Sequence, residues 1–287
     1  MKVRVGITIG DPAGIGPVIT QKALRELSGL ADFIVIGSAK GFTPSKMSRR
    51  SGQSSLKFLN QALDLLAAKR IDCLVTCPVS KEAVSKTGIH FSGHTEYLAQ
   101  KTKTRDYAMM LLNDKFKFVL LTRHIPLKEV PAALKQEDLK KTVLITDKYL
   151  KRFFNIQNPK IVVCGVNPHA SDNGLIGSEE NLILKPQISN AGLEIYGPIS
   201  ADIAIRRMLD KKYDCAIVAY HDQALIPLKL ISPASGVNIT LGLPFVRTSP
   251  LHGTAFDIAD QPRLADPASL IAAIKLVIKC ASNLKNA

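Results

Sequence analysis

The sequence predicts an α/β protein built on a largely parallel sheet. Two observations support this prediction: the composition, and the alternation of strand and helix patterns along the chain. The chain has 287 residues, 46% of them hydrophobic, which is enough to bury one large α/β core or two smaller ones. Aromatic residues make up only 6%, while Val, Ile, Leu and Ala dominate. That balance is typical of strands buried on both faces of a parallel sheet.

Seven short apolar runs alternate with helical patterns, which favours βαβ units. The runs cover residues 3–10, 33–38, 72–79, 116–122, 160–166, 214–220 and 237–243. Four leucines between residues 56 and 66 fall on one face of an expected helix. Asp266 and Pro267 form a helix start. The polar segment 41–55, which contains Gly and several Ser, is expected to be a surface loop.

The net charge of +14, from 38 Lys+Arg against 24 Asp+Glu, suits nucleic acid, an anionic membrane or small acidic substrates. The lysines are spread over several amphipathic segments, without an aromatic-basic RNA motif or a zinc-finger spacing, so no nucleic-acid partner is expected. No apolar run of about 18 residues and no signal peptide is recognisable, so a cytoplasmic protein without a membrane partner is expected. A small acidic substrate remains the favoured partner.

The cysteines are expected to be buried, reduced thiols. None of the five forms a Cys-x-x-Cys pair, and four lie in or beside apolar runs.

Three of the six histidines come within three residues of the end of an apolar run, and these are His124, His169 and His221. Ligands of open α/β sheets bind at the carboxyl ends of the strands, so the three imidazoles can converge there. A three-histidine site leaves open positions for a substrate oxygen and suits Zn, Co, Ni or Fe. A single histidine at such a place would most simply be interpreted as an ordinary loop residue. Three histidines at equivalent strand ends favour a metal site.

The segment GDPAGIGP (10–17) places glycines before a helix, where backbone N–H groups can face an anion. It lacks the Lys-Ser/Thr of a P-loop and does not fit GxGxxG. A tight structural turn is therefore expected around Asp11.

Eight motifs follow one another along the chain. They are GDPAGIGP (10–17), CPVSKEA (77–83), GIHFSGHTE (88–96), HIPL (124–127), NPHAS (167–171), YHDQ (220–223), VNITLGLPFVRTS (237–249) and HGTAFDIA (252–259). Together they resemble the 4-hydroxythreonine-4-phosphate dehydrogenase (PdxA) family nearly end to end. The resemblance implies a two-domain fold like that of isocitrate and isopropylmalate dehydrogenases, with mostly parallel sheets and a cleft between the domains. Residues 1–90 with 250–287 would form the first domain, and residues 91–249 the second, with most metal and substrate residues.

The resemblance also implies roles for individual residues of this chain. The metal ligands would be His124, His169 and His221, in agreement with the strand-end argument. The substrate would contact His94, Thr95, Lys229, Asn238 and Arg247. Catalytic roles would fall to Lys229, His94 and Asp257, and the cofactor would contact His252, Gly253, Thr254 and Asp257. Lys229 offers a point charge and Arg247 a planar fork for anions, although alone each could be a surface lysine or a structural ion-pair partner.

The implied reaction is oxidation and decarboxylation of 4-phosphooxy-L-threonine to 3-amino-2-oxopropyl phosphate in pyridoxal 5'-phosphate (vitamin B6) synthesis. It would use NAD (or NADP) and a divalent metal (Zn, Co or Mg), in a homodimer with the active site at the subunit interface. Three features depart from the family pattern: Val18 replaces a glutamate, Asp260-Gln261-Pro262 replaces GKG, and the loop at 40–54 is shorter.

Three alternatives remain open at this stage. One is a dehydrogenase of erythronate or threonate 4-phosphate, which would share the metal and the cofactor. Another is a phosphate acyltransferase, which has no need of three metal-binding histidines. The third is a non-catalytic homologue that binds a phosphorylated ligand.

Overall fold

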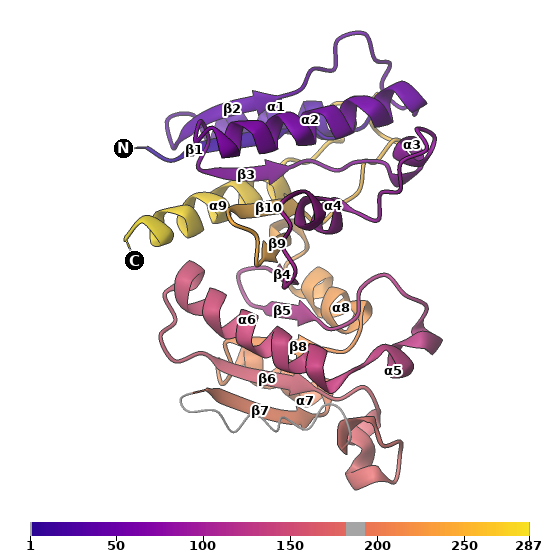
Figure 1. Ribbon diagram of the computed structural model, residues 1–287, viewed down its shortest axis with the longest axis vertical. Helices are drawn as coiled ribbons and strands as arrows, with labels where there is room; N and C mark the ends of the chain where they lie inside the picture. The colour runs from indigo at the N-terminus through magenta and orange to yellow at the C-terminus, as the bar shows by residue number, and fades with distance from the viewer. Residues whose placement is uncertain (1, 182–192, 287) are drawn as a thin grey trace. The chain divides into compact units, whose positions relative to one another are not determined.

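The computed structural model describes residues 2–181 and 193–286 and divides the chain into two compact units (Figure 1). The first unit holds residues 1–105 and 237–287, and the second holds residues 106–236. The second unit thus begins later and ends earlier than expected. His94 and Thr95 stay with the first unit because Tyr97, in the same helix, packs with Leu56 and Leu59. Asn238 and Arg247 stay there because the strand of Arg247 pairs with the first unit's strand Cys73–Thr76, and the strand of Asn238 pairs with that of Arg247.

The sheet of the first unit is mostly parallel, as predicted. Its order is β2 (Asp32–Ile36), β1 (Arg4–Thr8), β3 (Cys73–Thr76), β10 (Val246–Pro250) and β9 (Val237–Leu241). Only the β10–β9 pair is antiparallel. Strand β3 is buried along its whole length, which explains its continuous apolar sequence.

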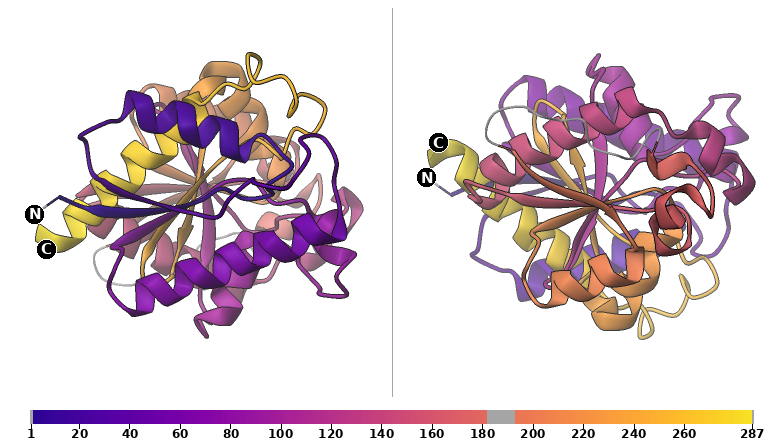
Figure 2. Two further views of the ribbon diagram at one scale, coloured as in Figure 1. Left: turned by 90° about the horizontal axis from the view of Figure 1, so that it is seen from above. Right: turned by 90° about the horizontal axis from the view of Figure 1, so that it is seen from below.

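Helices cover both faces of this sheet. One face carries α1 (Gly16–Glu26) and α9 (Ala268–Asn286), and the other carries α2 (Arg49–Ala67) (Figure 2). Short helices α3 (Lys81–Ser85) and α4 (His94–Lys101) follow β3 in the chain. The predicted start of α9 is confirmed, because the Asp266 carboxylate accepts a hydrogen bond from the Ala268 N–H at 2.9 Å.

The expected loop at 41–55 is wrong in its second half, because α2 begins at Arg49. Ser48 caps the helix: its hydroxyl accepts from the Ser51 N–H, and the Ser51 hydroxyl accepts in return from the Ser48 N–H. Gly52 is buried where a Cβ would lie 2.1 Å from the Ala83 carbonyl oxygen. The Ser and Gly of this segment thus allow close helix packing.

The second unit also contains a mostly parallel sheet. Its order is β4 (Ala108–Leu112), β5 (Lys117–Leu120), β8 (Cys215–Val218), β6 (Lys160–Cys164) and β7 (Glu194–Ile199). Only β4 and β5 pair antiparallel. Figure 2 shows α6 (Gln136–Phe154) on one face, and α7 (Ala201–Leu209) with α8 (His221–Ile231) on the other. The short helix α5 (Val130–Ala133) and 3-10 turns at Leu127–Glu129, Pro168–Gly174 and Pro233–Ser235 complete this unit.

All seven predicted strands are present, and β4, β7 and β10 were not predicted. The cysteines are free and buried, as expected, and burial raises the pKa of the Cys164 thiol to about 12. Within the described residues, no helix combines the length and apolar character needed to cross a membrane.

Candidate functional site

The three predicted metal histidines follow three adjacent parallel strands of the second unit. Strand β8 lies between β5 and β6, with Leu120 opposite Val218 and Val163 opposite Ile217. Because parallel strands in register end at the same edge of a sheet, the loops after them also leave at one edge. The three histidines therefore follow strands that end at the same edge of the sheet.

Two of these imidazoles lie side by side. The ring centroids of His124 and His221 are 5.6 Å apart, close to the spacing of about 5 Å that metal–nitrogen distances of about 2.1 Å give for two histidines on one tetrahedral ion. His221 Nδ1 lies 2.7 Å from Asp222 Oδ1. A carboxylate at Nδ1 fixes the tautomer and leaves Nε2 for an ion, as in most histidine metal sites.

His169 lies in a loop that Glu180 organises. The Glu180 carboxylate is 1% exposed and accepts from the Val166 N–H at 2.8 Å, the Asn167 N–H at 2.7 Å and the Ser171 hydroxyl. His169 itself has a left-handed φ of 53°. Among the described residues, no three His, Cys, Asp or Glu side chains form a group able to hold a metal ion. The structure therefore pairs His124 with His221 without bringing His169 to them.

Lys229 is exposed on the last turn of α8, eight residues after His221. That separation is about 12 Å along the helix axis. The structure thus places Lys229 on the same helix as a predicted metal ligand, though not beside it.

In the first unit, Arg247 is a cation buried among hydroxyl groups. It is 1% exposed, and its guanidinium donates to Thr76 Oγ1 from Nε at 3.0 Å and from Nη2 at 2.5 Å. Nη1 donates to Thr240 Oγ1 at 3.2 Å. Burial lowers the pKa of Arg247 to about 9, and the negative charge of Glu96 opposes this shift. A buried guanidinium that faces hydroxyls is suited to bind an anion.

His94, at the start of α4, is held neutral. Burial lowers its pKa well below the usual value and the charge of Arg247 adds to this, while a hydrogen bond to the backbone of Cys77 opposes it. Its Nε2 atom is buried and has no partner. A neutral imidazole with an unpartnered nitrogen can accept a hydrogen bond from a ligand hydroxyl.

Three predicted site residues leave a buried polar atom without a partner: His94 Nε2, Asn238 Oδ1 and His252 Nε2. Buried polar atoms in folded proteins are almost always hydrogen-bonded, so each unpaired atom requires an explanation. A bound polar ligand would supply the missing partners. Thr8, Ser45 and Asp147 also each have a buried polar atom without a partner, so an unpaired atom does not by itself assign a residue to a ligand site.

The glycine-rich turn and the expected cofactor loop lie side by side in the first unit. The Ile15 N–H donates to the Thr254 carbonyl oxygen at 2.9 Å, and a Cβ at Gly14 would come within 2.8 Å of that oxygen. Asp11 is fully buried and accepts from the Ala13 N–H at 3.0 Å. The sequence interpretation of a tight structural turn agrees with this geometry.

The expected cofactor residues themselves are accessible to a ligand. Gly253 and Asp257 are exposed, and a Cβ at Gly253 would have no neighbour within 4 Å. The segment Asp260-Gln261-Pro262, which differs from the family pattern, is held against α1. Lys22 Nζ of that helix donates to the carbonyl oxygens of Pro262 and Ala265, both at 2.7 Å.

Sequence reasoning missed three residues that support these positions, namely Thr76, Thr240 and Glu180. The two threonines hold Arg247, and Glu180 holds the loop that carries His169. Thr76 and Thr240 lie in apolar strands, where a threonine looks like any other β-branched residue. Only the contacts in the fold reveal their function.

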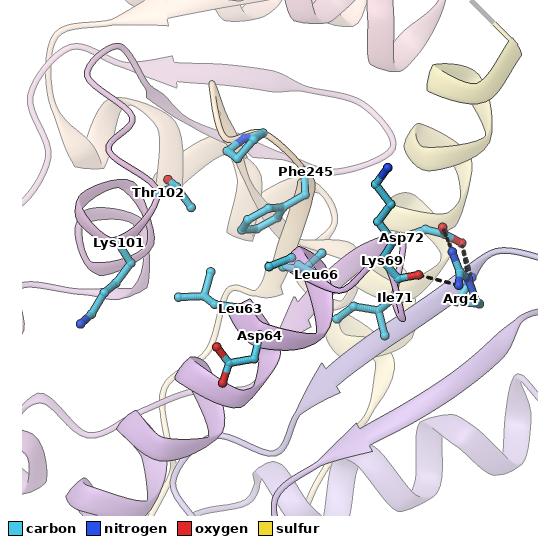
Figure 3. A pocket seen from close by; sticks show the side chains of 12 residues that line it. Arg4, Leu63, Asp64, Leu66, Lys69, Ile71, Asp72, Lys101, Thr102 and Phe245 are labelled. Atoms are coloured by element: carbon cyan, nitrogen blue, oxygen red, sulfur yellow. Dashed lines mark hydrogen bonds and ion pairs between the residues drawn. The ribbon is translucent and has the colours of Figure 1, made fainter.

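A cavity of about 630 Å³ opens at the other end of the first unit's strands (Figure 3). Leu63 and Leu66 of α2 and Phe245 before β10 form its apolar wall, beside Arg4 and Asp72. None of the predicted site residues lines it. Ligands of parallel sheets bind at the carboxyl ends of the strands, whereas this cavity lies where β1 and β3 begin, so we do not take it as the active site.

Asp72, beside this cavity, should stabilise the first unit in a pH-dependent way. Burial tends to raise its pKa, but hydrogen bonds from Arg4 and Lys285 lower it to about 2. A lowered carboxyl pKa stabilises the fold above about pH 4, and this contribution is lost as the pH falls toward 2. Because Arg4 and Lys285 are 42% and 48% exposed, we expect Asp72→Asn to cost about 1 to 2 kcal/mol at pH 7.

Thermal unfolding between pH 2 and 8 checks this prediction. The difference in Tm between wild type and Asp72→Asn should be constant above about pH 5 and shrink between about pH 4 and 2. Asp64→Asn, at an exposed carboxylate that lines the same cavity, is the matched control and should change Tm little. An Asp72→Asn difference that is independent of pH would contradict the assignment.

A family model described as "Pyridoxal phosphate biosynthetic protein PdxA" matches residues 17–277. The chain belongs to the PdxA family. The PdxA match confirms the resemblance inferred from the eight motifs.

Individual PdxA-type relatives cover nearly the whole chain. It is 38% identical to 4-hydroxythreonine-4-phosphate dehydrogenase of Sulfurihydrogenibium sp., covering 96% of this chain and 98% of the relative. It is also 38% identical, with the same coverages, to D-threonate 4-phosphate dehydrogenase of Salmonella typhimurium. The crystal structure of 4-hydroxythreonine-4-phosphate dehydrogenase from Klebsiella pneumoniae matches with a TM-score of 0.85 and 33% identity, over 98% of each chain.

The alignment with the Sulfurihydrogenibium sp. relative spans 317 positions, more than the 287 residues of this chain. The relative therefore contains segments that this chain lacks, in keeping with the shortened loop noted in the sequence.

Proposed function

We propose that this PdxA-family chain oxidises and decarboxylates 4-phosphooxy-L-threonine to 3-amino-2-oxopropyl phosphate, with NAD (or NADP) as hydride acceptor and a divalent metal. The observation that carries the proposal is the pairing of His124 with His221 after adjacent parallel strands. The buried Arg247 supports an acidic substrate. The names of the full-length relatives support a phosphorylated hydroxy acid.

His124, His169 and His221 would hold the metal, and Asp222 would fix the tautomer of His221. Three imidazole donors suit Zn or Co better than Mg. When bound, a divalent cation supplies Lewis-acid chemistry to the reaction. His169 would have to join the pair through a change in its loop, because the described conformation does not bring it there.

The remaining residues would bind and orient the substrate. Arg247 and Lys229 would bind its anionic groups, while Asn238 and Thr95 would fix its orientation through neutral hydrogen bonds. His94, neutral and with an unpartnered Nε2, would accept a hydrogen bond from a substrate hydroxyl. Because burial and the charge of Arg247 lower its pKa, His94 would act as a hydrogen-bond acceptor for the substrate more readily than as a base.

The loop of residues 252–257 would bind the adenosine part of the nicotinamide cofactor. Gly253 permits close approach of a ligand, and Asp257 offers an exposed carboxylate as a hydrogen-bond acceptor. His252 Nε2 and the Thr254 hydroxyl would supply further polar contacts.

We also propose a homodimer as the working form. Ile226, Leu230 and Ile231 on α8 are 58%, 76% and 48% exposed. Apolar side chains grouped on one helix are commonly covered by a partner chain, and a second copy is the partner that the family resemblance implies.

Oxidation of D-threonate 4-phosphate is the second candidate, because a relative with that name is also 38% identical over 96% of this chain. The two substrates differ in an amine against a hydroxyl. Measuring kcat/KM from NADH absorbance at about 340 nm, with each substrate and with D-erythronate 4-phosphate, separates the candidates.

We expect at least about a tenfold preference for 4-phosphooxy-L-threonine, because a site that hydrogen-bonds one substituent rejects its replacement. A preference for D-threonate 4-phosphate would overturn the proposed substrate while keeping the reaction class. If none of the three substrates yields NADH or NADPH, the dehydrogenase proposal itself is overturned.

A further inference from the structure

We propose that Thr240 is a positioning residue that makes Thr95 a hydrogen-bond donor toward an oxyanion of the ligand. This inference deepens the proposed function and rests on it for the identity of the ligand. It concerns a hydroxyl that lies behind Arg247 and Thr95 rather than one of the expected substrate contacts. The argument depends on the direction of each hydrogen bond in a buried chain.

Strand register places Thr240 directly against Arg247. The two residues are Cα partners in the antiparallel pair of β9 and β10, so their side chains lie on the same face of the sheet. Asn238 precedes Thr240 by two residues and therefore shares that face. Two expected substrate contacts thus flank a threonine that the sequence does not single out.

Arg247 fixes the role of the Thr240 oxygen. A guanidinium carries five N–H donors and no acceptor, so in the 3.2 Å contact Arg247 Nη1 donates and Thr240 Oγ1 accepts. Three of the five N–H groups are used on Thr76 and Thr240. These two threonines leave two N–H groups of the guanidinium over, and the charge of Glu96 offsets only part of the cost of burying Arg247, so an anionic ligand would still be favoured here.

The Thr240 hydroxyl hydrogen must then be donated elsewhere. Thr240 is fully buried, and its remaining contact is Thr95 Oγ1 at 3.2 Å. In either direction one hydroxyl hydrogen has no acceptor among the described residues. If Thr95 donated, that hydrogen would belong to Thr240, which is fully buried between Arg247 and Thr95; if Thr240 donates, it belongs to Thr95 at the start of α4, where a ligand can accept it. The favoured direction therefore runs from Arg247 to Thr240 and from Thr240 to Thr95.

Thr95, as an acceptor from Thr240, has its own hydrogen left for a ligand. It lies in the first turn of α4, an eight-residue helix whose N-cap, Gly93, makes no side-chain hydrogen bond. The charge of Arg247, which reaches Thr95 through Thr240, favours an anionic oxygen. The unpartnered and buried Nε2 of the adjacent His94 is a second sign that a ligand belongs here.

Thr240→Val removes the hydroxyl at nearly constant volume, and Thr240→Ser restores it. The test measures the thermal stabilisation of each full-length variant by inorganic phosphate, and by D-glycerate in a separate titration to show whether a phosphate or a carboxylate binds here. We expect Thr240→Val to weaken binding of one of these anions by about tenfold, and Thr240→Ser to stay within about threefold of wild type. If the valine variant does not fold, Thr240→Cys takes its place.

A double-mutant cycle with Thr95→Val tests whether Thr240 acts through Thr95. The loss in Thr95→Val/Thr240→Val should be clearly smaller than the product of the two single losses. With substrate, Thr240→Val should raise KM more than it lowers kcat. Losses that multiply, wild-type anion binding in Thr240→Val, or failure of serine to restore binding would each overturn the proposal.

The anion titrations need no turnover, so they separate this inference from the proposed function. Absence of NADH formation together with the expected Thr240 pattern would overturn the reaction and keep the inference. NADH formation without the expected Thr240 pattern would keep the proposed reaction and overturn the inference about Thr240.

Discussion

Arg247→Met should lower kcat/KM for the phosphorylated substrate by at least about 100-fold while leaving the free energy of unfolding within about 1 kcal/mol of wild type. The guanidinium is 1% exposed, and burial lowers its pKa to about 9. The negative charge of Glu96 offsets the cost of burying this cation only in part, so the charge is unfavourable to the folded protein. An anionic ligand would compensate that charge, and an apolar side chain of similar length removes it.

Steady-state kinetics and denaturant unfolding check the two halves of this prediction. Arg247→Lys keeps the charge without the planar fork and should still lose about tenfold or more in kcat/KM. Arg25→Met, at an exposed arginine of α1, is the matched control and should behave as wild type. Wild-type kcat/KM in Arg247→Met would show that this residue is structural.

His221→Ala should lower metal affinity by at least about 100-fold and abolish metal-dependent NADH formation, and His169→Ala should do the same. Removing one of three imidazoles leaves too few donors to hold the ion tightly. Asp222→Asn should have a smaller effect of about tenfold or more on metal affinity, because it weakens the orientation of the His221 ring without removing a donor.

Metal content after dialysis, measured by atomic absorption, is the direct readout for these variants. His90→Ala is the control: His90 is exposed, contacts Ser92 at 2.9 Å and is not expected in the site. Full metal content in His169→Ala would remove this residue from the proposed ligand set. The pair of His124 and His221 would then need a different third donor.

The three strands missed from the sequence each lack the usual strand pattern. Strand β4, AMMLL, contains no β-branched residue, so its apolar run is equally typical of a helix. Strand β7, EIYGPI, contains Gly197-Pro198, which is tolerated because β7 is the edge strand of its unit's sheet. Strand β10, VRTSP, has an arginine at its second position that looks exposed but is buried against Thr76 and Thr240.

The sequence predicted which histidines follow strands, because strand ends can be located from apolar runs. It could not predict that His124 and His221 come together while His169 stays apart, since that depends on loop conformation. Equally, nothing in the sequence of Thr240 indicates its contacts, which arise from the register between β9 and β10. Motifs identify ligand-facing residues, whereas the residues behind them become visible only in the fold.

The most direct test of the central claim is NADH formation from 4-phosphooxy-L-threonine by the chelator-treated protein, before and after a divalent metal is restored. The proposed function predicts no NADH after chelation, recovery with Zn or Co, and no recovery in His221→Ala. Equal NADH formation with and without chelator would contradict a metal-dependent dehydrogenase built on His124, His169 and His221.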